Sequence, residues 1–314
     1  MNLPRFDELP VIEPLGMRHA WDVFGAEDNL GTLNLITPER VVCALAEVRH
    51  GRTVNLSRPL SWPSPPLYNR AELSHEIFRK DRNRWDDRVA SFYPQSSTQW
   101  DGFRHIRCRE YGFYQGVVDD PPEMGSRLGI DHWARRGIVG RGVLLDVVGY
   151  LTAREGRIDA LAERAVTAEE LTEAADAQGL TVQPGDVLCL RFGWTQGYEG
   201  LPASARESMA AMTSGMAFAG LRADEEMARL LWNWGVAAVA ADNPAVEVSP
   251  GDPKVGSLHR RLLALLGIPL GELFDFDELA RLATAEGKWS FLFVSVPLHL
   301  VGGVGSPANA IAIL

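Results

Sequence analysis

Four polar side chains in one short segment are of types that could act as acids, bases or ligands. In Gln95-Ser-Ser-Thr-Gln99-Trp-Asp101-Gly-Phe-Arg-His105, the two amides, the carboxylate and the imidazole all occupy odd positions. Alternate side chains of an extended chain point to the same face, so these four would line one surface. We therefore predict a strand over residues 95–101 that faces a cavity, with Asp101 and His105 as catalytic candidates. A half-exposed strand, or a turn at Asp101 and Gly102, would give the same pattern without chemistry.

Aromatic residues on both sides of this segment could form the walls of a substrate pocket. Most aromatic side chains belong to the core, but several beside one polar surface would make an apolar pocket with a few polar anchors. Such a pocket suits an aromatic or polyketide-like small molecule. The candidate substrate-binding residues are Gln95, Gln99, Trp62, Tyr68 and Tyr114. Trp100 would face away from Gln99 and Asp101 in a regular strand, and we rank it lower.

The elements that must position these residues alternate between strand and helix patterns. Strands are predicted at 52–60, 142–150, 187–192, 236–241, 291–300 and 308–314. Helices are predicted from Pro38 behind a Thr37 cap, from Thr167 to Gly179, and over 224–234, 257–266 and 275–285. This alternation predicts an α/β fold.

The chain is divided into an irregular N-terminal arm, residues 1–36, and a single catalytic domain, residues 37–314. Within the domain, residues 61–92 begin with several prolines and continue into the charge-rich run 79–88. We interpret this stretch as a long loop or flap, because long ordered loops in compact domains are often functional.

The composition is typical of a soluble globular protein. Of 314 residues, 46% are hydrophobic and 23% are charged, which excludes disorder as the main state. The net charge of −10 argues against nucleic-acid and anionic-membrane partners. Three scattered cysteines form neither a disulfide framework nor a CxxC site, and no signal peptide or membrane span is evident. We expect a cytoplasmic location.

The segment 95–105 resembles the signature of the cyclase / kynurenine formamidase-like hydrolase family, His-x-Gly-Thr-His-x-Asp-x-Pro-x-His. Gln95 and Gln99 stand where the family has its first two His, and Asp101 and His105 match the Asp and the last His. Further blocks resemble the longer branch of the family in the same order along the chain. They are residues 52–60, 137–146, 183–194, 241–247 and 259–273.

The resemblance implies a swivelling β/β/α sandwich with a mixed β-sheet core and flanking helices, a small-molecule substrate, and a homodimer or homotetramer. It implies a divalent metal held by Gln95, Gln99, Asp101, His259 and Glu272, and His105 as the acid–base residue. Read from the sequence alone, His259 could equally be a packing residue among leucines, and Glu272 a carboxylate in the first turn of the following helix.

The two glutamines that replace signature histidines change the expected metal. Amide oxygens suit Mn or Mg, whereas imidazoles suit Zn, so we place Mn or Mg ahead of Zn and leave a metal-free site open. Three functions remain. The first is a hydrolase that cleaves a C–N (amide or lactam) or C–O bond. The second is a metal-light or metal-free cyclase or lyase of secondary metabolism, and the third a non-catalytic binder of small molecules.

Overall fold

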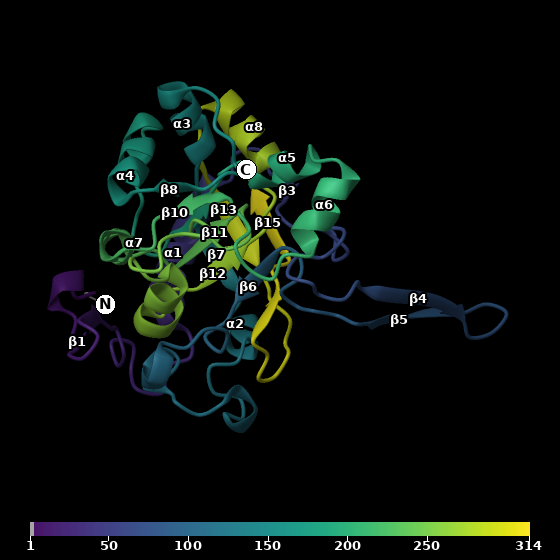
Figure 1. Cartoon of the computed structure of the whole chain (residues 1–314), viewed down its shortest axis with the longest axis horizontal. Helices are drawn as coiled ribbons and strands as arrows, with labels where there is room; N and C mark the ends of the chain where they lie inside the picture. The colour runs from purple at the N-terminus through teal and green to yellow at the C-terminus, as the bar shows by residue number, and fades with distance from the viewer. Residues whose placement is uncertain (1–2) are drawn as a thin grey trace.

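Nine strands pair into one mixed β-sheet in the computed structural model, which describes residues 3–314 (Figure 1). Their order across the sheet is β14 (Gly305–Pro307), β6 (Gln99–Asp101), β12 (Leu270–Glu272), β11 (Ala238–Ala241), β9 (Val187–Leu190), β7 (Ile138–Leu145), β13 (Ser290–Ser295), β15 (Ala310–Ile313) and β3 (Thr53–Asn55). The strands β12, β11, β9 and β7 run parallel, and the outer strands pair antiparallel. Every residue of β9 and β11 is buried, as expected for parallel strands covered on both faces.

Helices flank the sheet and cover it (Figure 1). The α-helices are α1 (Pro38–Ala44), α2 (Asp131–Arg136), α3 (Val147–Glu155), α4 (Ala168–Ala177), α5 (Trp194–Glu199), α6 (Ala203–Ala210), α7 (Glu225–Trp234) and α8 (Asp277–Glu286). A π-helix, η7, spans Arg260–Leu266, and short 3₁₀ turns occur at η1 (Phe6–Glu8), η2 (Gly31–Leu35), η3 (Leu45–Glu47), η4 (Arg109–Tyr111), η5 (Tyr114–Gly116) and η6 (Pro121–Glu123). A two-stranded parallel sheet joins β8 (Arg164–Val166) to β10 (Ala219–Leu221).

The predicted α/β fold with a mixed sheet is confirmed, and so are several helix starts. Thr37 accepts a hydrogen bond from the backbone N–H of Arg40, and Thr167 forms a capping box with Glu170. The predicted strand 142–150 was wrong in its bounds, because β7 ends at Leu145. The carboxylate of Asp146 then accepts from the N–H of Gly149 and starts helix α3.

Residues 3–36 pack against the body of the protein and bury apolar side chains there. This segment contains a small hairpin of β1 (Val11–Ile12) and β2 (Met17–Arg18), and Phe6 and Leu33 are buried in the main core. The Trp21 indole donates to the carbonyl of Ala264, 2.9 Å away, from an otherwise irregular part of the chain.

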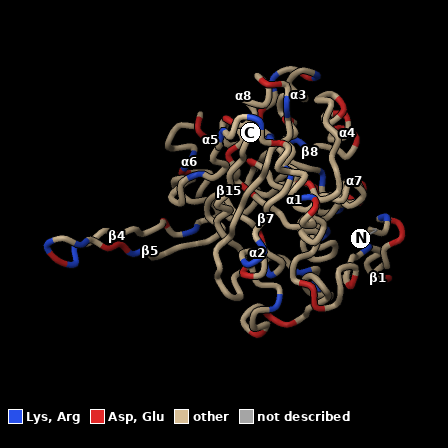
Figure 2. Tube along the Cα trace, turned by 180° about the vertical axis from the view of Figure 1, so that it is seen from behind, with Lys and Arg blue, Asp and Glu red and all other residues tan. Residues whose placement is uncertain are grey.

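Residues 61–92, which we predicted to be a long loop or flap, contain a β-hairpin. Strands β4 (Ser74–Arg79) and β5 (Trp85–Ala90) pair antiparallel into a hairpin that projects far from the body (Figures 1 and 2). The charged residues of both strands hide the alternating pattern of a β-hairpin in the sequence. Within residues 3–314, no helix combines the length and the apolar character that crossing a membrane requires.

Candidate functional site

Two neighbouring antiparallel strands bring the predicted amide and carboxylate side chains to one face of the sheet. In the pairing of β6 with β12, Glu272 lies opposite Gln99. The side-chain amide of Gln99 donates to Glu272 Oε2 at 2.6 Å. Trp100 occupies the opposite face, as predicted, where its fully buried indole donates to Ser295 Oγ at 2.9 Å.

His259 completes this cluster from the segment that leads into the π-helix η7. Its Nε2 lies 3.0 Å from Glu272 Oε1 and 3.6 Å from Asp101 Oδ2. One ligand atom each from Asp101, His259 and Glu272 lies within 4.8 Å of the other two, and all three residues are buried. Two carboxylates and one imidazole at this spacing are a donor set suited to a divalent cation.

Two buried oxygen atoms in the cluster have no hydrogen-bond donor. They are Asp101 Oδ2 and Gln99 Oε1. A buried acceptor left without a partner costs about 1–3 kcal/mol, so such atoms call for a ligand. A cation beside them would satisfy both, and we conclude that the residues present fit a divalent metal.

Glu247 stands behind His259 and was not among the predicted site residues. Its Oε1 lies 2.9 Å from His259 Nδ1, and it also accepts from the hydroxyl of Ser257 at 3.2 Å and from the N–H of Leu258. With Nδ1 engaged by Glu247, the Nε2 atom of His259 faces Asp101 and Glu272.

The loop after β11 fixes the position of Glu247. The Asp242 carboxylate accepts from the N–H groups of Phe192 and Gly193, at 2.7 and 2.8 Å. The Asn243 side chain accepts from the N–H of Val246 at 2.7 Å. Val246 has φ of +57°, which is strained for a β-branched residue, so the loop is held against its local preference. The Asp-Asn pair in block 241–247 thereby acts on the site through Glu247.

The buried charges perturb one another strongly. Burial favours the neutral form of Asp101, but nearby His105 and His259 and the amide of Gln95 outweigh it and lower its pKa to about 2. Burial and the charge of Asp101 raise the pKa of Glu272 to about 8. Burial opposes charge on His259, yet its contacts with Asp101, Glu247 and Glu272 raise its pKa well above the usual value. A positive charge within the cluster is therefore electrostatically favourable.

Gln95 and His105 reach the cluster from turns and not from the strand. The prediction of a strand over 95–101 was wrong in extent, because β6 begins at Gln99 and residues 93–96 form a turn. The Gln95 amide still donates to Asp101 Oδ1 and lies 3.1 Å from His105 Nδ1. A Cβ on Gly305 would stand 2.6 Å from the Gln95 side chain, so a glycine at 305 permits this approach.

His105 faces the cluster from its more exposed side. Its Nε2 lies 3.6 Å from Asp101 Oδ2, and 29% of its side chain is exposed. Burial lowers the pKa of His105, with partial compensation from Asp101, which favours the neutral imidazole. A neutral imidazole beside a cluster that favours positive charge is suited to accept and return a proton.

Two of the three predicted aromatic residues lie in one apolar cluster beside the site. Trp62 and Tyr68 pack with Trp194, Tyr198 and Leu273, and Leu273 directly follows Glu272. Burial and the neighbouring charge of Glu272 raise the pKa of Tyr68. Tyr68 also has φ of +61°, an uncommon conformation that often occurs at functional sites.

The structure does not bring Tyr114 to this group. Its ring is fully buried, 4.6 Å from the ring of Phe103, and its hydroxyl donates to Asp28 at 3.2 Å. In these contacts it is a core residue, whose closeness to the signature in sequence does not place it at the site.

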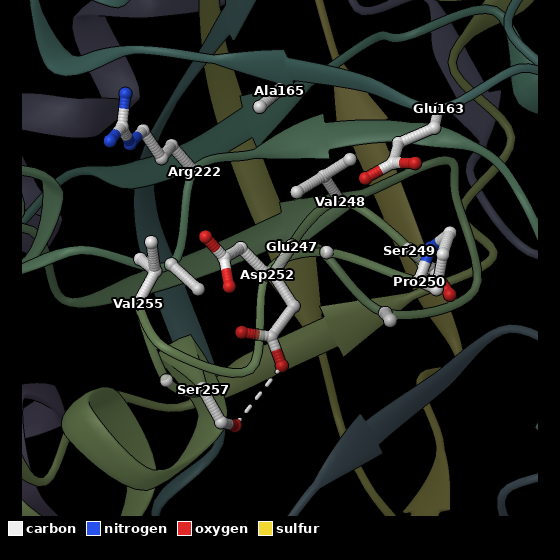
Figure 3. A pocket seen from close by; sticks show the side chains of 14 residues that line it. Glu163, Ala165, Arg222, Glu247, Val248, Ser249, Pro250, Asp252, Val255 and Ser257 are labelled. Carbon is white, nitrogen blue, oxygen red and sulfur yellow. Dashed lines mark hydrogen bonds between the residues drawn. The ribbon is translucent and has the colours of Figure 1, made fainter. Parts of the chain in front are cut away.

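A cavity of about 460 Å³ lies on the outer side of Glu247 (Figure 3). Its lining includes Glu163, Arg222, Asp252 and Ser257, and the hydrogen bond between Ser257 and Glu247 is visible in Figure 3. Glu247, the carboxylate that contacts His259, therefore also lines a cavity whose lining does not include Asp101 or Glu272.

The fold is similar to that of solved structures in the cyclase group. A solved structure described as a novel cyclase aligns with 94% of this chain and 99% of its own, at 28% identity and a TM-score of 0.83. Isatin hydrolase A from Labrenzia aggregata, bound to benzyl benzoate, aligns with 87% of this chain and 97% of its own, at 16% identity and a TM-score of 0.60. An isatin hydrolase bound to the product analogue thioisatinate has 15% identity over 88% of this chain and 99% of its own, with a TM-score of 0.57.

The family itself is established by a family model described as "Putative cyclase", which matches residues 54–248, more than half of the chain. The protein belongs to this cyclase family, as the resemblance of residues 95–105 and the later blocks implied. No match was found among curated proteins.

Proposed function

We propose that the protein is a metal-dependent hydrolase that cleaves an amide, lactam or ester bond of a small aromatic substrate. The observation that supports this most is the buried cluster of Asp101, His259 and Glu272, in which Asp101 Oδ2 lacks a hydrogen-bond donor. Membership of the cyclase family and the fold shared with isatin hydrolases support the same class of reaction.

Asp101, His259 and Glu272 would hold the cation, with Gln99 Oε1 as a further donor. Oxygen donors outnumber the one nitrogen in this set, which favours Mn or Mg over Zn. A divalent cation bound by these residues would polarise a carbonyl and make water more acidic. Glu247 keeps the imidazole of His259 in the orientation that this role needs, since it is hydrogen-bonded to Nδ1.

His105 carries the proton in this proposal. Because burial lowers its pKa, the neutral imidazole accepts a proton from the attacking water and passes it to the leaving nitrogen or oxygen. The Gln95 amide, 3.1 Å from His105 Nδ1, orients the ring. Asp101 stays ionised throughout, since its pKa is about 2.

The aromatic cluster of Trp62 and Tyr68 would bind the apolar part of the substrate. The Trp62 ring stands edge-on to Trp194 at 6.0 Å between ring centres, and the Trp194 indole N–H is buried without an acceptor. A flat substrate that carries a carbonyl would match such a surface. Isatin, named in two of the similar structures, is a cyclic aromatic amide, and compounds of this class are the first substrates to test.

A second function, a metal-free cyclase or lyase, is supported by one specific observation. Three carboxylates, those of Asp101, Glu247 and Glu272, surround His259 and raise its pKa well above the usual value, so its imidazole can carry a positive charge. That internal cation would offset part of the negative charge of the cluster without a metal, and His105 would then act on a reactive substrate as acid or base.

Three functions can be distinguished by measuring turnover of a panel of lactams, amides and aryl esters, with added Mn and with a chelator. The hydrolase predicts ring opening or bond cleavage that a chelator abolishes and Mn restores. Conversion that resists the chelator supports the metal-free enzyme. Tight binding of one compound without conversion supports a non-catalytic binder and would contradict both enzyme proposals.

A further inference from the structure

Arg70 is a partly buried cation at the edge of the cluster, in the segment that leads into β4 (Figure 1). Its Nη1 donates to the backbone carbonyl of Gln95. The side-chain amide of Gln95 in turn contacts Asp101 and His105. A single residue therefore links the guanidinium of Arg70 to the proposed proton carrier. Within residues 3–314, Arg70 forms no ion pair with a carboxylate, so no internal anion balances its charge.

The backbone before Arg70 holds its side chain in place. Tyr68 and Asn69 have φ of +61° and +53°, two successive residues in the left-handed region, which is uncommon without glycine. The N–H of Asn69 donates to the carbonyl of Ala210 at 3.0 Å. The guanidinium carbon of Arg70 stands over the ring of Tyr68, 5.4 Å from its centre. In the described part of the chain only Gln95 accepts from this guanidinium, which leaves N–H donors for a ligand.

The charge of Arg70 acts on the groups that would perform the chemistry. Burial lowers the pKa of His105, and the positive charges of His259 and Arg70 lower it further, whereas Asp101 opposes them. Burial and the charge of Asp101 raise the pKa of Glu272 to about 8, and Arg70 is among the cations that oppose this rise. An anion bound to Arg70 would therefore lie near both the proton carrier and a proposed metal ligand.

We propose that Arg70 binds a carboxylate of the substrate, on a part of the substrate other than the bond that is cleaved. A guanidinium and a carboxylate can form two parallel hydrogen bonds, and an arginine without an internal ion pair is free to make them. The inference rests on the proposed hydrolase function. It narrows the substrates to aromatic amides, lactams or esters that carry a negative charge.

Tyr68 connects this contact to the aromatic cluster. It packs in the same apolar cluster as Trp62, and its ring lies beneath the guanidinium of Arg70. An aromatic ring bound against the cluster would direct its carboxylate toward Arg70 and its amide or ester toward His105. The carboxylates of the metal cluster repel an anionic substrate, and the charge of Arg70 offsets this repulsion.

Calorimetric binding of matched pairs of aromatic amides tests the proposal on the full chain. The charged members are para-acetamidobenzoate and meta-acetamidobenzoate, and the two acetamidobenzamides of the same shape are their neutral counterparts. The wild type should bind the charged member about 10-fold or more tightly than the neutral member in at least one pair. Arg70→Gln should lose this preference and should bind the neutral members as the wild type does.

Arg82→Gln is the matched control, because Arg82 carries the same charge but is exposed in the turn between β4 and β5. It should keep the preference of the wild type. Arg70→Lys keeps the charge without the planar donor group, so it should recover part of the preference. Thermal melting of the variants checks that each is folded.

A wild type without a preference for the carboxylate in either pair would overturn the proposal. So would a preference that persists in Arg70→Gln, since the carboxylate would then bind elsewhere. A loss of affinity in Arg70→Gln that is equal for charged and neutral members would make Arg70 a structural residue and would also overturn it.

Release of acetate from the same compounds reports the hydrolase function separately. A preference that depends on Arg70, in a protein that releases no acetate, would support this role of Arg70 and count against the hydrolase. Acetate release without such a preference would support the hydrolase and overturn the role of Arg70.

Discussion

The Nδ1 atom of His259 lies 2.9 Å from the carboxylate of Glu247, while Nε2 of the same ring lies 3.0 Å from Glu272. Glu247 therefore orients the imidazole, and Glu272 and the Nε2 atom of His259 both face Asp101. The two contacts orient the imidazole of His259 as a metal ligand, although its neighbours in sequence are leucines. They depend on the loop after β11, which Asn243 holds in place.

Replacing Glu247 by Gln tests whether Glu247 orients His259 for a metal. The variant keeps the size and the acceptor oxygen but loses the charge that pairs with the imidazole. Mn affinity, measured by calorimetric titration, should fall about 10–100-fold. Asp252→Asn removes another carboxylate from the same cavity wall and serves as the control. Equal Mn affinity in the wild type and Glu247→Gln would refute this role.

Gln99 and Gln95 set the metal preference in our account. Replacing both by His should raise Zn affinity, because imidazole is the better Zn ligand. The single change Gln99→His should supply most of the gain in Zn affinity. The Oε1 atom of Gln99 has no hydrogen-bond partner, whereas Gln95 already contacts Asp101 and His105. Competition with a Zn-binding dye measures this. Unchanged Zn affinity in both variants would mean that these side chains are not ligands.

His105→Ala and His105→Asn separate a catalyst from a packing residue. As the proton carrier, His105 should contribute about 10²–10⁴-fold to turnover, which both variants should lose. Substrate binding should change less, because the proton moves in the transition state. Melting temperatures should stay close to that of the wild type, since His105 is partly exposed. Unchanged turnover together with a loss of about 1–3 kcal/mol in stability would identify a structural histidine instead.

Glu170 allows a prediction about pH that is independent of the site. Burial opposes its ionisation, but hydrogen bonds from Arg164, from the N–H of Thr167 and from Arg154 lower its pKa from 4.5 to about 2. Ionised Glu170 therefore stabilises the fold fully above pH 4.5, and this contribution disappears as the pH falls through about 2. Glu170→Gln should cost about 1–2 kcal/mol at pH 7.

Denaturant unfolding of the wild type and Glu170→Gln at several pH values measures that contribution. The difference between the two proteins should be constant from pH 7 down to about 5 and should shrink below pH 4.5. A difference that does not depend on pH would show that the charge of Glu170 contributes nothing to stability.

Part of the site could be predicted from the sequence, because a motif match and the alternation of side chains along a strand can both be read from short segments. Asp101, His259 and Glu272 were named by matching motifs, and the register of β6 with β12 brings Asp101 and Glu272 to one face. The alternation argument failed for Gln95 and His105, because turns, not a longer strand, bring them in.

Other features depend on tertiary contacts that carry no local signal. Glu247 gains its role only when the loop after β11 packs beneath His259, although it ends a block that resembled the family. Tyr114 is close to the signature in sequence but is drawn into the core against Phe103. The strands of the β4–β5 hairpin escaped prediction because charged side chains interrupt the apolar alternation that marks a strand.

Direct Mn titration is the simplest test of whether Asp101, His259 and Glu272 bind a divalent cation, as we propose. Paramagnetic resonance of free Mn, followed as protein is added, reports binding without any substrate. We expect saturation at about one Mn per chain, and Mn affinity about 100-fold or more weaker in Asp101→Asn and Glu272→Gln. A wild type that leaves the free Mn signal unchanged, or variants that bind as tightly as the wild type, would contradict it.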